Sequence, residues 1–154
     1  MIKVMFVCHG NICRSPMAEF WMKDVVKRKG IESEFYIASS ATSTEEIGNP
    51  PHHGTRQKLA EYGISTAGKQ AVQLTKSDYE RYDYFLGMDI ANIRNMLRIF
   101  KSDPEEKVYR LLEFAGLSRD IRDPWYTGNF DETFADINAG IEAFFKYLEM
   151  KKEL

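Results

Sequence analysis

The sequence contains no long hydrophobic run. Spanning a bilayer requires roughly 18 or more consecutive apolar residues, and no stretch of the 154 residues approaches that length. The first apolar segment, residues 2–7, is also too short for a secretory signal and leads directly into the most distinctive loop of the chain. We therefore expect a cytoplasmic protein with no membrane partner.

The chain also lacks an excess of positive charge and contains few cysteines. Lysine and arginine total 21 against 23 aspartate and glutamate residues, the formal net charge is -2, and no basic block occurs along the chain. These features argue against nucleic acid as a partner. The chain has two cysteines, Cys8 and Cys13, five residues apart in one loop. This arrangement argues against a secreted disulfide framework and favours a reducing compartment.

Linkers, internal repeats and low-complexity segments are missing as well. Hydrophobic residues make up 44% of the chain and charged residues 29%, which suits an ordinary globular protein. A chain of this length can bury most of its apolar surface in one core. We therefore expect a single domain over residues 1–154 that acts as a monomer.

What is present is an alternation of strand and helix patterns. It predicts an α/β fold, an open parallel sheet of about four strands flanked by helices on both faces. Ligands of such sheets bind beyond the carboxyl ends of the strands. Strands are expected at residues 2–7, 31–38, 84–88 and 108–111, and helices at residues 17–29, 55–62, 90–100 and 130–152, with a capped turn at 75–78 and a cap at Asp89.

The loop that follows the first strand has the composition of an anion site. Ser15 is a favoured N-cap and Pro16 a favoured first helical residue, so the helix is predicted to begin here with its unpaired N–H groups directed at Cys8. Loop N–H groups, the positive end of the helix and Arg14 would then surround a tetrahedral oxyanion above the cysteine sulfur.

The string Cys-x-Gly-Asn-x-Cys-Arg-Ser-Pro from Cys8 onward resembles the signature of the low-molecular-weight protein tyrosine phosphatases. Similar stretches continue through most of the chain, to Asp-Pro-Trp-Tyr at residues 123–126. The resemblance implies that the chain hydrolyses phosphotyrosine in protein substrates through a phosphocysteine, without cofactor or metal. Cys8 would be the nucleophile, since a helix N-terminus and a neighbouring cation favour a thiolate. The planar fork of Arg14 would hold the oxyanion.

The other loop residues are expected to shape the phosphate site. Gly10 permits close backbone approach, and Asn11 tolerates a left-handed conformation. The Ser15 hydroxyl has two competing uses, donating to the Cys8 sulfur or capping the helix. For His9, a solvated or loop-packing role is favoured over catalysis. Inorganic phosphate and other oxyanions should bind here as product or inhibitor.

Ile12 and Cys13 bear on substrate choice and redox behaviour. In the resembled family, relatives that act on phosphoarginine tend to carry threonine at the position of Ile12, whereas isoleucine accompanies phosphotyrosine. A cysteine at the position of Cys13 can form a reversible disulfide with the nucleophile there and shield it from irreversible oxidation. A passive Cys13 is an equally open reading of the sequence.

The resemblance locates the proton donor at Asp123. This carboxyl would protonate the leaving oxygen and then deprotonate the water that hydrolyses the phosphocysteine. Trp125 and Tyr126 would wall the cleft and sandwich a phenyl ring, which favours phosphotyrosine over the shorter phosphoserine. Taken alone, the same residues would be read as an Asp-Pro turn and ordinary core aromatics.

Three stretches depart from the family pattern, at Glu45, at His52 and at Val72, the last within the family's Ala-Arg-Gln. Glu45 stands where the family usually has an aromatic cleft wall, and a carboxylate there would repel acidic phosphopeptides and favour basic flanks. His52 and His53 replace part of the family's Pro-Pro-Asp stretch. Two adjacent loop histidines without further ligands do not make a metal site, so none is expected.

Two other functions share these features. Arsenate mimics phosphate, and related arsenate reductases have this loop, but they relay the oxidation through further cysteines that this chain lacks. A non-catalytic module that binds phosphotyrosine or senses oxidants would need neither a nucleophile nor an acid. The presence of Cys8, Arg14, Ser15 and Asp123 together therefore favours a phosphatase.

Overall fold

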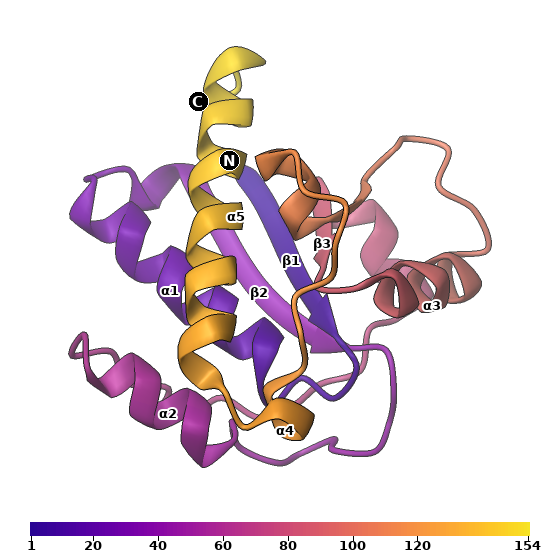
Figure 1. Ribbon diagram of the computed structural model, residues 1–154. Helices are drawn as coiled ribbons and strands as arrows, with labels where there is room; N and C mark the ends of the chain where they lie inside the picture. The colour runs from indigo at the N-terminus through magenta and orange to yellow at the C-terminus, as the bar shows by residue number, and fades with distance from the viewer.

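Four parallel strands form the sheet in the computed structural model, which describes every residue from Met1 to Leu154 (Figure 1). They lie in the order β2-β1-β3-β4, and every neighbouring pair is parallel. The expected open parallel sheet is therefore confirmed. The strands are β1 (Ile2–Cys8), β2 (Phe35–Ala41), β3 (Tyr84–Gly87) and β4 (Val108–Arg110).

Helices cover both faces of this sheet, as expected. α1 and α5 pack together on one face, whereas α3 and the 3-10 helix Lys76–Glu80 lie against the strands on the other face (Figure 1). The five helices are α1 (Arg14–Arg28), α2 (His53–Ala60), α3 (Ile90–Phe100), α4 (Pro124–Thr127) and α5 (Phe130–Met150).

Strand β1 divides its side chains between two hydrophobic clusters. Val4 and Phe6 belong to the larger cluster under α1 and α5, while Met5 and Val7 belong to the smaller one under α3. Successive residues of a strand point to opposite faces, so a nearly continuous apolar run is what a central parallel strand requires. The same alternation turns Cys8 toward the face of α1.

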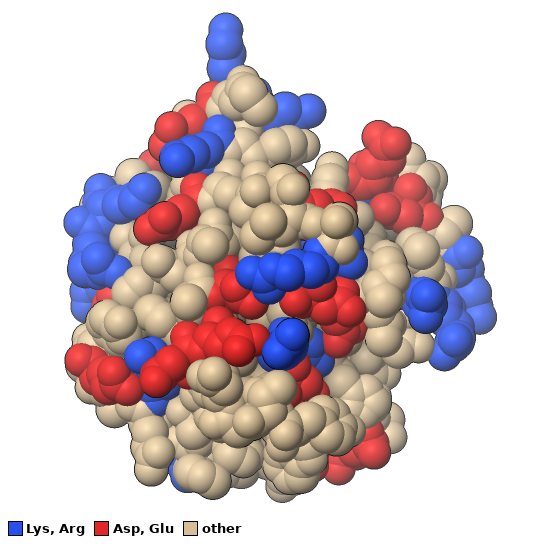
Figure 2. Space-filling view, viewed as in Figure 1, with Lys and Arg blue, Asp and Glu red and all other residues tan.

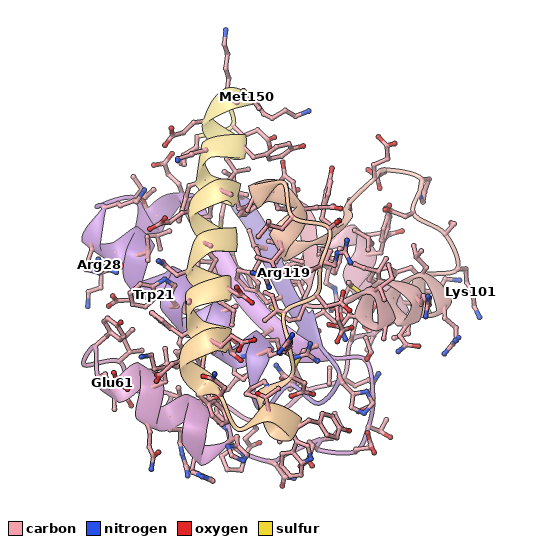
Figure 3. All side chains as sticks on the ribbon, viewed as in Figure 1. Trp21, Arg28, Glu61, Lys101, Arg119 and Met150 are labelled. Atoms are coloured by element: carbon pink, nitrogen blue, oxygen red, sulfur yellow. The ribbon has the colours of Figure 1, made fainter.

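The contact between α1 and α5 is anchored by Trp21. Its indole N–H donates to Asn138 Oδ1 at 2.9 Å, and its ring meets Phe134 edge-on at 4.8 Å between centroids (Figure 3). On the surface that carries α5, acidic and basic side chains are interspersed (Figure 2). None of the helices is both long and apolar enough to span a bilayer.

Several predicted boundaries are confirmed closely. Helix α3 has the predicted ends, and the Asp89 carboxylate caps it by accepting the Asn92 N–H at 2.8 Å. The predicted capped turn is a capping box between Thr75 and Asp78. Helix α5 begins at Phe130 as expected and ends at Met150, two residues early.

Strand β2 was placed too early by the sequence pattern. It begins at Phe35 rather than Ile31, because Glu32–Glu34 form an exposed 3-10 turn. It continues to Ala41, since all seven of its residues pair with β1, from Ile2 with Phe35 to Cys8 with Ala41. The length of its partner, rather than its own apolar pattern, determines where it ends.

Two short helices were not predicted, the 3-10 helix Leu111–Ala115 and α4. The first packs on α5, where Gly140 makes room for it. A Cβ at Gly140 would lie 2.5 Å from Leu111 Cγ, and the Leu111 side chain is fully buried. The contact therefore requires glycine inside a helix that would otherwise favour alanine.

Replacing Gly140 with alanine should lower the free energy of unfolding by about 1–3 kcal/mol, because the new methyl group overpacks a buried site. Chemical denaturation measures this change. Ala139→Gly, at the exposed neighbouring position, reports helix propensity alone, about 1 kcal/mol. Stabilisation by Gly140→Ala would show that propensity, not the Leu111 contact, governs this position.

Candidate active site

The Cys8 sulfur lies at the carboxyl end of β1 beneath a loop that surrounds it with hydrogen-bond partners. The backbone N–H groups of Asn11 and Ser15 donate to Sγ at 3.3 and 3.4 Å, and Ser15 Oγ lies 3.0 Å from it. Cys8 is only 3% exposed. This set of donors suits a negatively charged sulfur.

Ser15 does not cap α1, contrary to the sequence prediction. The helix begins at Arg14, its N-cap is Cys13, and no side chain caps it. The Ser15 hydroxyl accepts a hydrogen bond from Asn11 Nδ2 at 2.7 Å, which leaves its own hydrogen for the Cys8 sulfur. Of the two competing uses of this hydroxyl, the structure selects the one directed at sulfur.

Asn11 fixes the shape of the loop. Its backbone has φ of 58°, in the left-handed region that the sequence analysis allowed for it. Its side chain is fully buried and makes three hydrogen bonds, donating to Ser15 Oγ and to Ser39 Oγ and accepting from Val72 N–H at 3.1 Å. These bonds compensate the uncommon backbone conformation.

A buried polar chain supports Asn11 from behind. Ser39 Oγ donates to Glu19 Oε1 at 2.5 Å, and Glu19 is 4% exposed. Lys69 Nζ lies 3.4 Å from the same carboxylate oxygen and donates to the Ser39 carbonyl at 3.0 Å. Burial lowers the pKa of Lys69, and the charge of Glu19 opposes this shift. The sequence analysis did not identify Glu19, Ser39 or Lys69.

The Arg14 guanidinium is 2% exposed and joins the loop to two other segments. Nη1 donates to Asp89 Oδ2 at 2.7 Å and to the Ile121 carbonyl at 2.9 Å, and Nη2 lies 3.5 Å from Asp123 Oδ2. Burial acts to lower the pKa of Arg14, but the charges of Cys8, Asp89 and Asp123 raise it overall. Arg14 therefore keeps its charge despite being buried.

The N–H groups on Nε and Nη2 make no hydrogen bond within the protein, whereas both hydrogens of Nη1 are used. These two atoms form one edge of the guanidinium, the fork that binds two oxygens of a carboxylate or phosphate. Asp89 was recognised in the sequence as a helix cap but not as the partner that orients Arg14. Its carboxylate does both, one oxygen for each.

Asp123 lies at the N-cap of α4. Its Oδ1 accepts the Trp125 N–H at 3.0 Å, and its Oδ2 faces Arg14. Hydrogen bonds at Ile121 and Arg119 hold the segment that precedes Asp123. Ile121 N–H donates to the Met88 carbonyl at 2.9 Å, and Arg119 makes two 2.8 Å hydrogen bonds with Asp136 of α5 (Figure 3).

These elements enclose a pocket of about 190 Å³ at the carboxyl end of β1. The structure brings together nine of the eleven predicted site residues there, while Asn11 and Ser15 lie beneath the loop as its supports. Glu46, which the sequence analysis did not single out, is also part of the wall. The lining residues are Cys8, His9, Gly10, Ile12, Cys13, Arg14, Glu45, Glu46, Asp123, Trp125 and Tyr126.

The rim of the pocket is polar on one side and aromatic on the other. His9 Nε2 is paired with Glu45 Oε2, and both side chains are more than half exposed. Trp125 and Tyr126 contribute aromatic surface to the same pocket, with exposed fractions of 56% and 84%. Glu45 thus occupies the wall at which the resembled family has an aromatic residue, and His9 is its partner rather than a free loop side chain.

Cys13 is 4% exposed but lines the pocket. Burial, followed by the charges of Asp123 and Cys8, raises the pKa of its thiol to about 12. Cys13 is therefore a neutral thiol at physiological pH, which favours a packing role over a reactive one. Both cysteines are free thiols.

His52 and His53 stack on each other with ring centroids 4.2 Å apart. The His52 ring accepts the Gly54 N–H at 3.0 Å and so caps α2, which starts two residues earlier than predicted. No group of three or more His, Cys, Asp or Glu side chains is arranged to hold a metal ion.

Comparison with known proteins identifies the family of this chain. The profile of the family described as Low molecular weight phosphotyrosine protein phosphatase matches residues 3–154. The chain is 39% identical to the Low molecular weight protein-tyrosine-phosphatase YfkJ of Bacillus subtilis (strain 168) over all of both chains. It is 40% identical to the Low molecular weight phosphotyrosine protein phosphatase of Schizosaccharomyces pombe, over 83% of each.

Solved structures agree with this assignment. The crystal structure of YfkJ from Bacillus subtilis superposes with a TM-score of 0.93, covering 99% of this chain and 97% of that one. SP-PTP, a low molecular weight protein tyrosine phosphatase from Streptococcus pyogenes, gives a TM-score of 0.84 at 40% identity, covering 96% and 93%. The chain therefore belongs to the low molecular weight protein tyrosine phosphatases, a family of hydrolases.

Proposed function

We propose that the chain hydrolyses phosphotyrosine in protein substrates through a phosphocysteine on Cys8, with Arg14 as oxyanion binder and Asp123 as general acid and base. One observation carries this proposal. A sulfur with three hydrogen-bond partners, the unused edge of a buried guanidinium and a carboxyl group line one pocket. These are the groups that displacement at phosphorus requires.

In the first step the Cys8 thiolate attacks phosphorus and the bond from phosphorus to the tyrosine oxygen breaks. Asp123 gives its proton to the departing oxygen, so no free aryl oxide forms. In the second step Asp123 accepts a proton from water as that water attacks phosphorus. The S–P bond breaks, and Cys8 returns as a thiolate with inorganic phosphate as the second product.

Arg14 stabilises both transition states. Nε–H and Nη2–H are free to hold two equatorial oxygens, while Asp89 and the Ile121 carbonyl keep the guanidinium in place. Loop N–H groups of residues 9–14 and the start of α1 supply the remaining donors to the phosphoryl group. The same cradle should bind inorganic phosphate and other oxyanions as product or inhibitor.

The walls of the pocket suit an aryl phosphate ester. Ile12 on one side and Trp125 and Tyr126 on the other offer apolar and aromatic surface to a phenyl ring. We further propose that the chain acts as a monomer in the cytoplasm, a compartment that keeps Cys8 and Cys13 reduced. A reversible disulfide between them stays a prediction, which the high pKa of Cys13 disfavours.

The proposal predicts turnover of an aryl phosphate at mildly acidic pH in reductant and excess chelator, and loss of that turnover in Cys8→Ser, since a hydroxyl is a far weaker nucleophile than a thiolate. Release of inorganic phosphate measures both. Loss of native activity in chelator would indicate a metal. No turnover by folded, reduced native protein would instead support a phosphate-binding module.

Asp123→Ala should lower kcat/KM for phenyl phosphate by about 10²- to 10⁴-fold. The loss for nitrophenyl phosphate should be much smaller, because its leaving group needs little protonation. Asp131→Ala is the control, since that exposed carboxylate pairs with Lys58 and does not line the pocket. Equal losses on both substrates would remove Asp123 from the role of general acid.

The acidic rim predicts a preference for phosphotyrosine peptides with basic flanks. The pocket walls carry Glu45, Glu46 and Asp123, and the cation among them, Arg14, is buried. Glu45→Gln should reduce this preference about two- to fivefold, with the effect fading at high salt. Glu61→Gln, at the exposed C-cap of α2 and outside the pocket lining, is the control. Equal native rates on acidic and basic peptides would contradict this prediction.

A further inference from the structure

His52 does not line the pocket, yet it contacts the loop that holds Cys8, helix α4 and the start of α5. Its backbone N–H donates to the Ile12 carbonyl at 2.8 Å, in the loop that holds Cys8. Its ring meets Trp125 of α4 edge-on, with centroids 5.6 Å apart and planes at 79°. The same ring stacks on Phe130, the first residue of α5, at 5.3 Å and 18°.

The stack of His52 on Phe130 depends on the absence of a side chain at Gly54, near the start of α2. A Cβ at Gly54 would lie 2.4 Å from the Phe130 ring, so only glycine allows that ring to lie against the helix and reach His52. Trp125 has no other aromatic neighbour than His52. Helix α4 is only four residues long and few of its side chains are buried. The contact between His52 and Trp125 therefore contributes to holding the exposed side of this helix in place.

The imidazole has a defined proton arrangement. Nδ1 accepts the Gly54 N–H at 3.0 Å, so in the neutral ring the proton is on Nε2. Protonation of Nδ1 would remove this acceptor and leave the first turn of α2 uncapped. The His52 side chain therefore provides both the cap of α2 and the stack on Phe130, and the cap requires its neutral form.

We propose that His52 is a positioning residue for proton transfer, holding α4, and with it Asp123, against the loop that carries Cys8. The inference rests on the proposed function of Asp123. It goes beyond that function by assigning the alignment of donor and nucleophile to a side chain that touches neither of them.

Charged groups on two elements face the imidazole. His53 and Arg56 lie beside it on α2, and Asp123 faces it from α4, while its neighbour on α5, Phe130, is uncharged. Burial, then His53 and Arg56, lowers the pKa of His52 from its ordinary value of 6.5, and Asp123 opposes this shift. The cap is therefore intact above pH 6.5 and is lost as the pH falls through the lowered pKa.

Two substitutions separate the cap from the stack. His52→Asn keeps a capping oxygen but removes the ring, and should lower kcat/KM about tenfold for phenyl phosphate and less than about threefold for nitrophenyl phosphate. His52→Phe keeps a ring but removes the cap. It should retain the native ratio between the two substrates and lower the melting temperature by about 3 °C. His53→Ala, exposed and without contact to α4, is the control.

A second measurement does not depend on activity. An imidazolium quenches indole fluorescence, so tryptophan emission of the native protein should fall as the pH drops through the lowered pKa of His52. The other tryptophan, Trp21, has Tyr62, Phe134 and Asn138 as its neighbours and no histidine. The transition should be absent in His52→Asn and His52→Phe and present in His53→Ala.

The outcomes distinguish the two proposals. If the native protein hydrolyses neither aryl phosphate but its emission titrates as described, the phosphatase mechanism fails while the contact of His52 with Trp125 stands. If folded His52→Asn loses activity equally on both substrates, or keeps all of it, His52 does not position Asp123. Persistence of the emission transition in both His52 variants would also overturn the assignment.

Discussion

A guanidinium buried at the first residue of α1 determines how the segments of this protein meet. Arg14 is withdrawn from water, so its charge must be compensated by groups of the protein. Asp89 at the start of α3 and two groups of the segment 121–123, the Ile121 carbonyl and the Asp123 carboxylate, supply the partners. The same arrangement brings the carboxyl group of Asp123 into the pocket that Cys8 lines.

Much of this could be predicted from the sequence, because the relevant signals are local. The apolar run of β1, the cap at Asp89 and the periodicity of α5 each depend on residues adjacent in the chain. The loop from Cys8 to Ser15 is recognisable for the same reason, since one short string contains its cysteines, its arginine and its left-handed asparagine. The Cys8 loop lies where ligands of parallel sheets bind, at the carboxyl end of β1, and the contacts of Ile121 with Met88 and of Asp123 with Arg14 bring the second predicted segment to it.

The remaining features depend on contacts between distant segments. The end of β2 depends on its pairing with β1, and the use of the Ser15 hydroxyl depends on Asn11, whose amide faces it across the loop. Likewise, no local pattern shows that Asp89 orients Arg14 or that Glu19 supports the loop through Ser39. A histidine cap is equally hard to recognise, because the residues usually expected there are Ser, Thr, Asp and Asn.

Both ends of the chain lie at the edge of the sheet opposite α4 and the pocket (Figure 1). Met1 is 72% exposed, and the C-terminal segment is fastened on that side by a 2.7 Å hydrogen bond from Tyr84 to Glu153. A tag, surface tether or fused domain at either end would stand on the far side of the molecule. The mouth of the pocket would then stay open to substrates as large as folded proteins.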